Sequence, residues 1–99
     1  MVTTMIEVPG GTPEKYRELT QRLGVGADTP PDGLIFHTAS KTEDGLLIFN
    51  IWESEEHFQR FSERVMPMMS EMGMRAQPRI LETINLVRGK AAIPSATLR

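Results

Sequence analysis

Apolar and polar side chains alternate through the first residues of the chain and then take up helical spacing. Residues 2–8 carry an apolar or β-branched side chain at every second position, until Pro9-Gly10-Gly11 ends the run. A period of two predicts a β-strand. Thr12-Pro13 then supplies a helix N-cap and a proline at the first helical position, and apolar residues recur at helical spacing as far as Gly24. The pattern therefore predicts a strand over 2–8 and a helix over 13–23.

A connection rich in Gly and Pro over 24–33 precedes two β-rich runs, 34–41 and 46–53. Asp44-Gly45 lies between the two runs, and an Asp-Gly pair flanked by strands is a strong local signal for an antiparallel hairpin. We therefore expect the second and third strands to pair directly. The connection before them is long enough to form a lip over a functional site.

A second helix and a fourth strand complete the pattern. Ser54 is a favourable N-cap, two glutamates follow it, and an apolar stripe at helical spacing predicts a helix over 55–72. Pro67 lacks a backbone donor, so we expect the helix to bend or break there. After Pro78 apolar residues alternate again, which predicts a fourth strand, and 89–99 is expected to be an irregular tail.

The order β-α-β-β-α-β predicts an α+β fold of the ferredoxin-like type, a four-stranded antiparallel sheet with two helices on one face. We expect a single domain over 1–88. The hairpin is apolar on both of its faces: Leu34, Phe36, Leu47, Phe49 and Ile51 share one parity, and Ile35, Ala39, Leu46 and Ile48 share the other. Because two helices can cover only one face, the second face predicts a homodimer in which two sheets stack into a dimeric α/β barrel.

Composition and charge narrow the classes of function. The 99 residues carry 11 basic and 13 acidic side chains, a net charge of -2, and no cysteine. Disulfides and thiolate metal sites are therefore excluded, and no basic stripe exists for nucleic acid or an anionic membrane. The two histidines are not at metal-ligand spacing, and no phosphate-binding glycine loop opens a helix. No apolar run approaches the roughly 20 residues of a membrane span. We expect a cytoplasmic protein without nucleic-acid, membrane, metal or cofactor partners.

His37, Asn50 and Trp52 share one face of the hairpin in either simple register. A two-residue turn would place His37 opposite Trp52, and a four-residue loop would place it opposite Asn50, but neither choice changes the face. The imidazole is a candidate base, the amide both donates and accepts hydrogen bonds, and the indole offers an aromatic wall. Such a group can bind a flat molecule that bears oxygen. The structural alternative is that Trp52 belongs to the core and the two polar residues are satisfied interior groups.

The apolar stripe of the second helix is the other candidate region. We expect a substrate pocket lined by Phe58, Phe61, Val65, Met66, Met69 and Met72. Five of the seven methionines fall within 66–74, around Pro67. Methionine is flexible and polarizable, so this cluster either fills irregular gaps in the core or adapts to an apolar ligand. His57 lies in the first turn of the helix beside two glutamates, where an exposed surface position is the default expectation.

Several segments resemble one known family. The segments Gly33-Leu34-Ile35-Phe36-His37-Thr38-Ala39, Trp52-Glu53-Ser54-Glu55-Glu56-His57-Phe58 with Phe61, and Met66-Pro67 before Gly73 are similar to the antibiotic biosynthesis monooxygenase-like group of dimeric α/β-barrel proteins. The order of strands extends the resemblance over about residues 1–88, and it implies that fold and a homodimer. Members of the group include cofactor-independent monooxygenases that oxidise phenolic polyketides to quinones, and haem-degrading enzymes. Polyketide cyclases share the barrel.

The resemblance also implies site residues. In the quinone-forming branch an Asn, a Trp and an Arg lie near the pocket; Asn50 and Trp52 are the matching types here, and no arginine occupies an evident equivalent place. The haem-degrading branch uses an Asn on the first strand and a His on the second helix. Residues 3–7 contain no Asn, and His57 falls at the very start of its helix, so haem is not expected.

The sequence thus favours a small oxidoreductase that oxidises a phenolic, polyketide-type molecule without a cofactor. In this hypothesis His37 accepts the phenolic proton, Asn50 hydrogen-bonds a ring oxygen, and Trp52 stacks on the ring. The first alternative is a polyketide cyclase or dehydratase that uses the same base without oxygen. The second is a non-catalytic dimeric protein that binds a small hydrophobic molecule. Fold alone leaves these three functions open.

Overall fold

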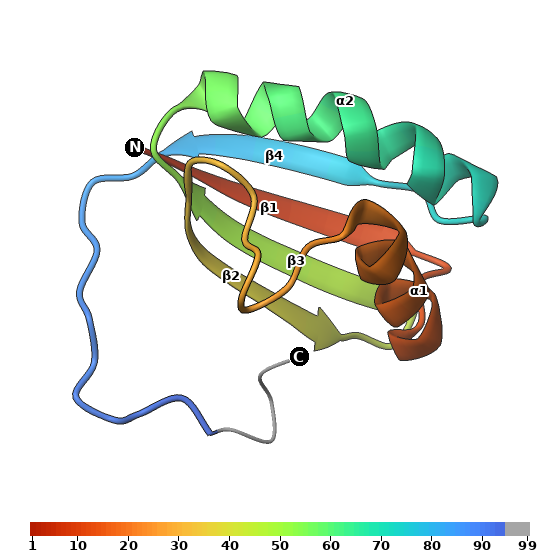
Figure 1. Cartoon of the computed structure of the whole chain (residues 1–99), viewed down its shortest axis with the longest axis horizontal. Coiled ribbons are helices and arrows are strands. Elements are labelled where there is room, and N and C mark those ends of the chain that lie inside the picture. The colour runs from red at the N-terminus through yellow and green to blue at the C-terminus, as the bar shows by residue number, and fades with distance from the viewer. Residues whose placement is uncertain (95–99) are drawn as a thin grey trace.

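Two helices lie on one face of a four-stranded antiparallel sheet with the strand order β2-β3-β1-β4 (Figure 1). The structure, a computed structural model, describes residues 1–94. The elements in chain order are β1 (Val2–Pro9), α1 (Pro13–Leu23), β2 (Leu34–Lys41), β3 (Gly45–Trp52), α2 (Glu55–Glu71) and β4 (Gln77–Glu82). The expected β-α-β-β-α-β order and the ferredoxin-like fold are confirmed.

Local capping fixes the two helices. The Thr12 hydroxyl accepts the Lys15 backbone N–H at 3.1 Å at the start of α1, and Gly24 ends that helix in a left-handed conformation with φ of 71°. The Ser54 hydroxyl caps α2 in the same way by accepting the backbone N–H of His57. Because these signals are carried by neighbouring residues, the bounds of α1 match the prediction and those of α2 differ from it by one residue.

Helix α2 continues through Pro67, so of the two expected outcomes, a bend or a break, the break is wrong. A proline removes one hydrogen bond of the helical ladder, and here that loss falls close to the C-terminal end. Val65 and Met69, on either side of Pro67, are both buried in the core, while Pro67 itself is exposed. The burial of these two side chains holds the last turns of the helix against the sheet.

The hairpin has the four-residue alternative of the two registers. Lys41 pairs with Leu46 and His37 pairs with Asn50, and the loop between them is closed by a 2.9 Å hydrogen bond from the Thr42 N–H to the Gly45 carbonyl. One expectation about β2 is wrong, however. The register shifts between Leu34 and Phe36, because a bulge inserts an extra residue.

The bulge changes which side chains face the helices. Leu34, expected on the same face as Phe36, pairs with Trp52 and contacts the core instead. Ile35, expected among the helix-facing residues, has no partner in the ladder and is 45% exposed. One inserted residue reverses the parity of everything before it, and no local sequence signal announces that insertion.

Strand β4 is shorter than the alternation after Pro78 suggested. It ends at Glu82, which pairs with Val2, because its neighbour β1 begins there and offers nothing further to pair with. Ile84 and Leu86, expected in this strand, leave the sheet, and Ile84 is 94% exposed. Pro78 is tolerated because β4 is an edge strand. Of the tail expected over 89–99, residues 89–94 form no helix or strand, and 95–99 lie outside the described residues.

The hydrophobic core occupies the space between the helices and the sheet. Its buried members are Ile6, Val8, Leu19, Leu23, Leu46, Ile48, Trp52, Phe58, Val65, Met69 and Met74. No helix of the described residues covers the opposite face, which we call the open face; strand alternation places Met5, Phe36, Leu47, Phe49, Ile51 and Leu81 on it. Within residues 1–94 no helix is both long and apolar enough to cross a membrane.

Candidate functional site

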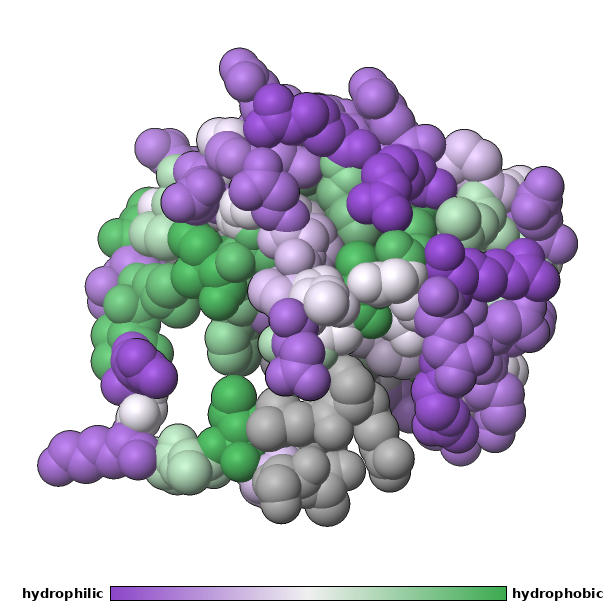
Figure 2. Space-filling view, viewed as in Figure 1, coloured by the Kyte–Doolittle hydropathy of each residue, from purple (hydrophilic) through white to green (hydrophobic). Residues whose placement is uncertain are grey.

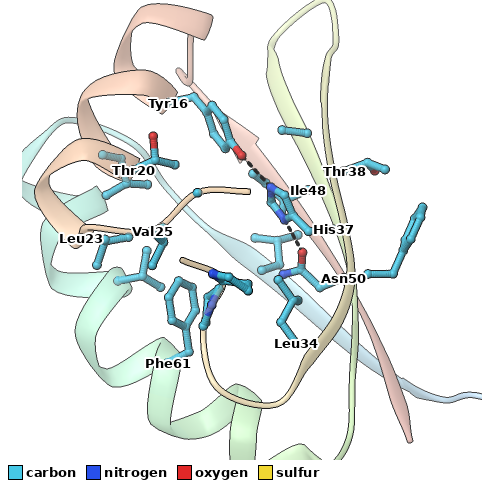
Figure 3. A pocket seen from close by; sticks show the side chains of 18 of the residues that line it. Tyr16, Thr20, Leu23, Val25, Leu34, His37, Thr38, Ile48, Asn50 and Phe61 are labelled. Carbon is cyan, nitrogen blue, oxygen red and sulfur yellow. Dashed lines mark hydrogen bonds between the residues drawn. The ribbon is translucent and has the colours of Figure 1, made fainter. Parts of the chain in front are cut away.

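A cavity of about 610 Å³ lies between the helices and the sheet. Strands β2 and β3 contribute Leu34, Ile48 and neighbouring residues, and α1 and α2 contribute Leu23, Phe61 and other apolar side chains (Figure 3). The connection 24–33 passes in front of the sheet between α1 and β2, and half of its residues line the cavity: Val25, Gly26, Ala27, Pro30 and Pro31 (Figure 1). This connection therefore borders the cavity as a lip.

Three polar side chains form a hydrogen-bonded chain along one wall of this cavity (Figure 3). The Tyr16 hydroxyl of α1 lies 2.6 Å from Nε2 of His37 on β2, and Nδ1 of His37 lies 2.5 Å from Oδ1 of Asn50 on β3. An amide oxygen can only accept, so Nδ1 carries the imidazole proton. Nε2 is then an acceptor, and Tyr16 donates its hydroxyl proton to it.

The fold brings these three residues together from segments far apart in the sequence. His37 and Asn50 are paired across β2 and β3, and Tyr16 lies on the face of α1 that packs toward the sheet. The rings of Tyr16 and His37 are nearly parallel, with an interplanar angle of 8°. Asn50 is 4% exposed, whereas His37 belongs to the exposed edge strand. The polar chain thus runs from a buried amide to a more accessible imidazole.

Burial of Tyr16 raises the pKa of its phenol above the ordinary value of about 10, because the surrounding apolar side chains disfavour the charged form. Tyr16 is therefore a neutral hydrogen-bond donor at physiological pH. The remaining lining is almost entirely apolar, and Arg17 is the one residue of the described lining that carries a permanent charge. Apart from Arg17, the lining offers a ligand dipoles and hydrogen bonds but no permanent charge.

Trp52 is fully buried beneath the cavity. Its indole N–H donates a 3.3 Å hydrogen bond to the Thr4 hydroxyl, and its ring packs against Phe58 and Phe61 at centroid distances of 6.1 and 5.5 Å. Because none of the indole surface is exposed, a ligand in the cavity meets the side chains that cover it. Trp52 is accordingly a wall held in place by its own neighbours.

The structure brings most of the expected site residues to this cavity. His37, Asn50 and Trp52 line it together, as do Phe58, Phe61, Val65, Met66 and Met69. Met72 lies outside the lining and packs against the core. The roles expected for these residues remain predictions.

Tyr16 is the polar residue that sequence reasoning missed. Tyr16 recurs with Leu19 and Leu23 at the helical spacing that predicts α1, and the structure places all three on the cavity side of that helix. A tyrosine on a core-facing stripe needs a partner for its hydroxyl, and that requirement was the available signal. The identity of the partner could not be known, because it depends on how α1 lies across β2.

His57 anchors the connection and lies outside the cavity lining. Its Nδ1 is 2.7 Å from the Ser54 hydroxyl, and its Nε2 is 3.6 Å from a Glu53 carboxylate oxygen. Its ring fills the space that a Cβ on Gly33 would occupy. Within the described part of the chain, no group of three or more His, Cys, Asp and Glu side chains is arranged to hold a metal ion.

Comparison with known proteins bears on the fold. No family model matches the chain, and no curated protein matches its sequence. Among solved structures, a Deinococcus radiodurans protein assigned to the antibiotic biosynthesis monooxygenases superimposes with a TM-score of 0.61 at 13% identity, over 92% of this chain and 100% of that chain. The chain shares its fold with antibiotic biosynthesis monooxygenases.

Two further structures support the same assignment. SnoaB, a cofactor-independent oxygenase from Streptomyces nogalater, has a TM-score of 0.60 at 14% identity, over 89% of this chain and 97% of its own. A monooxygenase from the gene ActVA-Orf6 of Streptomyces coelicolor, in complex with the ligand Nanaomycin D, has a TM-score of 0.56 at 19% identity. The match covers 95% of this chain and 92% of that chain. The resemblance expected from the sequence is confirmed at the level of the fold.

Proposed function

We propose that this protein is a cofactor-independent monooxygenase that oxidises a phenolic, polyketide-type aromatic molecule. The observation that carries the proposal is the Tyr16-His37-Asn50 chain on the wall of an apolar cavity. The volume of about 610 Å³ falls within the range of small-molecule sites. Apolar walls suit fused aromatic rings, and the imidazole supplies a base at the one polar wall.

The chemistry requires a base and dioxygen as the second substrate. Removal of the phenolic proton raises the electron density of the ring, which then transfers electrons to dioxygen. One oxygen atom replaces two hydrogens to form a quinone carbonyl, and the other leaves as water, so atoms and electrons balance without an external reductant. SnoaB, a cofactor-independent oxygenase with the same fold, is a precedent for this chemistry on such a scaffold.

Each polar residue has a defined part in this proposal. His37 is the base, and Asn50 holds it in the tautomer whose Nε2 accepts a proton. Asn50 accepts from His37 through Oδ1, and its amide nitrogen is assigned the role of donor to a ring oxygen of the substrate. Trp52, which is fully buried, supports the cavity wall through its packing against Phe58 and Phe61.

We further propose that two copies associate through their open faces. That face carries apolar side chains from all four strands, and among them Phe36 and Leu81 are about two-fifths exposed, at 43% and 39%. The segment that follows β4 leaves the sheet and exposes Ile84 and Val87, at 94% and 77% (Figure 2). A two-fold pairing of sheets removes both surfaces from water.

The function is tested by measuring oxygen uptake with a panel of mono-, bi- and tricyclic phenols. We expect at least one to be converted to a quinone with one dioxygen consumed per molecule. His37→Ala is expected to lower kcat by about 10²- to 10⁴-fold, the usual contribution of a general base. Gln59→Ala, at an exposed site on α2, is the control and should leave the rate unchanged.

Other outcomes would replace the proposal. Product formed at the same rate in the absence of oxygen would identify a cyclase or dehydratase. Tight binding of aromatic ligands without any turnover would identify a binding protein. An unchanged rate in His37→Ala would remove His37 from the mechanism.

A further inference from the structure

Both nitrogens of His37 are already engaged in the structure. Nδ1 donates its proton to Asn50, and the single lone pair of Nε2 accepts the Tyr16 hydroxyl at 2.6 Å. A neutral imidazole has one acceptor nitrogen. A substrate that enters this cavity therefore finds no free acceptor on His37 while Tyr16 holds its position.

The Tyr16 oxygen does have acceptor capacity. A phenolic hydroxyl carries one proton and two lone pairs, and in the described residues Tyr16 uses only its proton. Tyr16 also lines the cavity. A substrate hydroxyl can therefore donate a hydrogen bond to the Tyr16 oxygen while the hydrogen bond between Tyr16 and His37 stays intact.

We propose that Tyr16 is a catalytic residue through which His37 removes the substrate proton. The substrate O–H donates to the Tyr16 oxygen, and as its proton is transferred there, the original Tyr16 proton passes to Nε2 of His37. The products are a substrate phenolate, a neutral Tyr16 and an imidazolium that still donates to Asn50. This inference rests on the proposed function, because it specifies how the phenol at that site loses its proton.

The surroundings of Tyr16 favour such a relay over ionisation of Tyr16 in a separate step. Because burial raises the pKa of this phenol, a free tyrosinate is costly there. In the relay Tyr16 receives one proton as it gives up another, so it carries no full charge. The positive charge appears on His37, which lies on the exposed edge strand and has Asn50 to orient it.

Displacement of Tyr16 by the substrate is the competing geometry. It would break a short hydrogen bond and separate two rings that lie within 8° of parallel. The displaced side chain, which packs against the core, would also have to leave that packing. The amide nitrogen of Asn50 lies on the same wall and can hold a second substrate oxygen while Tyr16 stays in place (Figure 3).

The two geometries make opposite predictions for Tyr16→Phe. With the best phenol of the panel, the relay predicts that kcat falls by at least about a hundredfold, because Nε2 loses its connection to the substrate. Displacement predicts unchanged or faster turnover and tighter binding, because a competitor for Nε2 has been removed. Either of those results would overturn the inference. Fluorescence of Trp52, the only tryptophan, verifies that the variant is folded.

A second measurement tests the inference even if no phenol is oxidised. Nitrogen-15 NMR of His37 is recorded during titration with 2-naphthol under anaerobic conditions, where the proposed oxidation cannot proceed. The relay predicts that the resonances of Nδ1–H and of a hydrogen-bonded Nε2 persist when the probe binds to the wild-type protein, and that the Nε2 signal shifts in Tyr16→Phe. Loss of the Tyr16-His37 bond on binding of 2-naphthol would overturn the relay. Failure of the oxygenation assay alone would overturn only the proposed function.

Discussion

Both faces of the sheet are built by side chains that alternate along the same strands, but the helices cover only one of them. Along β3, Asn50 and Trp52 project toward the helices, whereas Phe49 and Ile51 project toward the open face. On the covered face the chain supplies its own partners, since the buried polar groups of Thr4 and Asn50 are both hydrogen-bonded. On the open face no helix of residues 1–94 covers the apolar side chains, and Phe36 and Leu81 there are 43% and 39% exposed, although Ile51 is buried. This difference is the basis on which we propose chemistry for the first face and association for the second.

Removal of Trp52 is expected to have the largest effect on the covered face. Trp52→Ala deletes a fully buried ring that packs against Phe58 and Phe61, so the free energy of unfolding should fall by about 3–5 kcal/mol. Urea denaturation followed by circular dichroism measures the loss. Trp52→Phe keeps most of the ring and should cost about 1–2 kcal/mol, mainly the hydrogen bond to Thr4 and a small void. Equal costs for the two variants would contradict the packing described.

A charge on the open face is expected to break the dimer while the fold survives. Phe49→Asp should raise the dissociation constant at least about a hundredfold, or about 2.7 kcal/mol, because a carboxylate must be buried in an apolar interface. Light scattering should then give 11.1 kDa in place of twice that mass. Gln59→Asp, on an exposed helix position, is the matched control. A wild-type mass of 11.1 kDa at micromolar concentration would refute the association of open faces.

The smallest effect concerns the ionisation of Tyr16, the only tyrosine of the chain. Its pKa is raised in the folded state, so on increasing pH the unfolded chain loses this proton first. The resulting contribution to stability is complete below the ordinary pKa of about 10 and is lost as pH rises through the folded value. Absorbance of the phenolate gives the titration directly, without interference from other tyrosines. A midpoint at or below that of a peptide tyrosine would contradict the burial.

Most of the fold followed from local signals in the sequence. Thr12-Pro13 and Gly24 marked the ends of α1, and Asp44-Gly45 marked the hairpin, because caps and turns are decided by adjacent residues. The end of β4 at Glu82 could not be predicted from the local sequence, because it depends on where the neighbouring strand β1 begins. The bulge beside Ile35 was hidden for a similar reason, because only the partner strand reveals an unpaired residue.

The residues of the candidate site that lie on the hairpin could be predicted from the sequence. His37, Asn50 and Trp52 share a face through strand alternation alone, and the structure places them on one cavity. The contact of Tyr16 with His37 joins a helix to a strand and depends on how the two elements pack. Sequence reasoning therefore identified lining residues within the hairpin and within α2, and missed the contact between α1 and β2.

The connection 24–33, the lip of the cavity, is held in place at Gly33, which packs against His57. The identity of its other residues does not affect this contact. Gly33 has a φ of 81°, and a side chain there would overlap the imidazole ring, so this position accepts glycine alone. The Gly33 carbonyl also accepts the Glu53 backbone N–H at 2.8 Å, which ties the segment to the start of α2. Residues 25–32 are free of that restriction. Substitutions within those eight residues can therefore alter which molecules enter the cavity while the contact between Gly33 and His57 is kept.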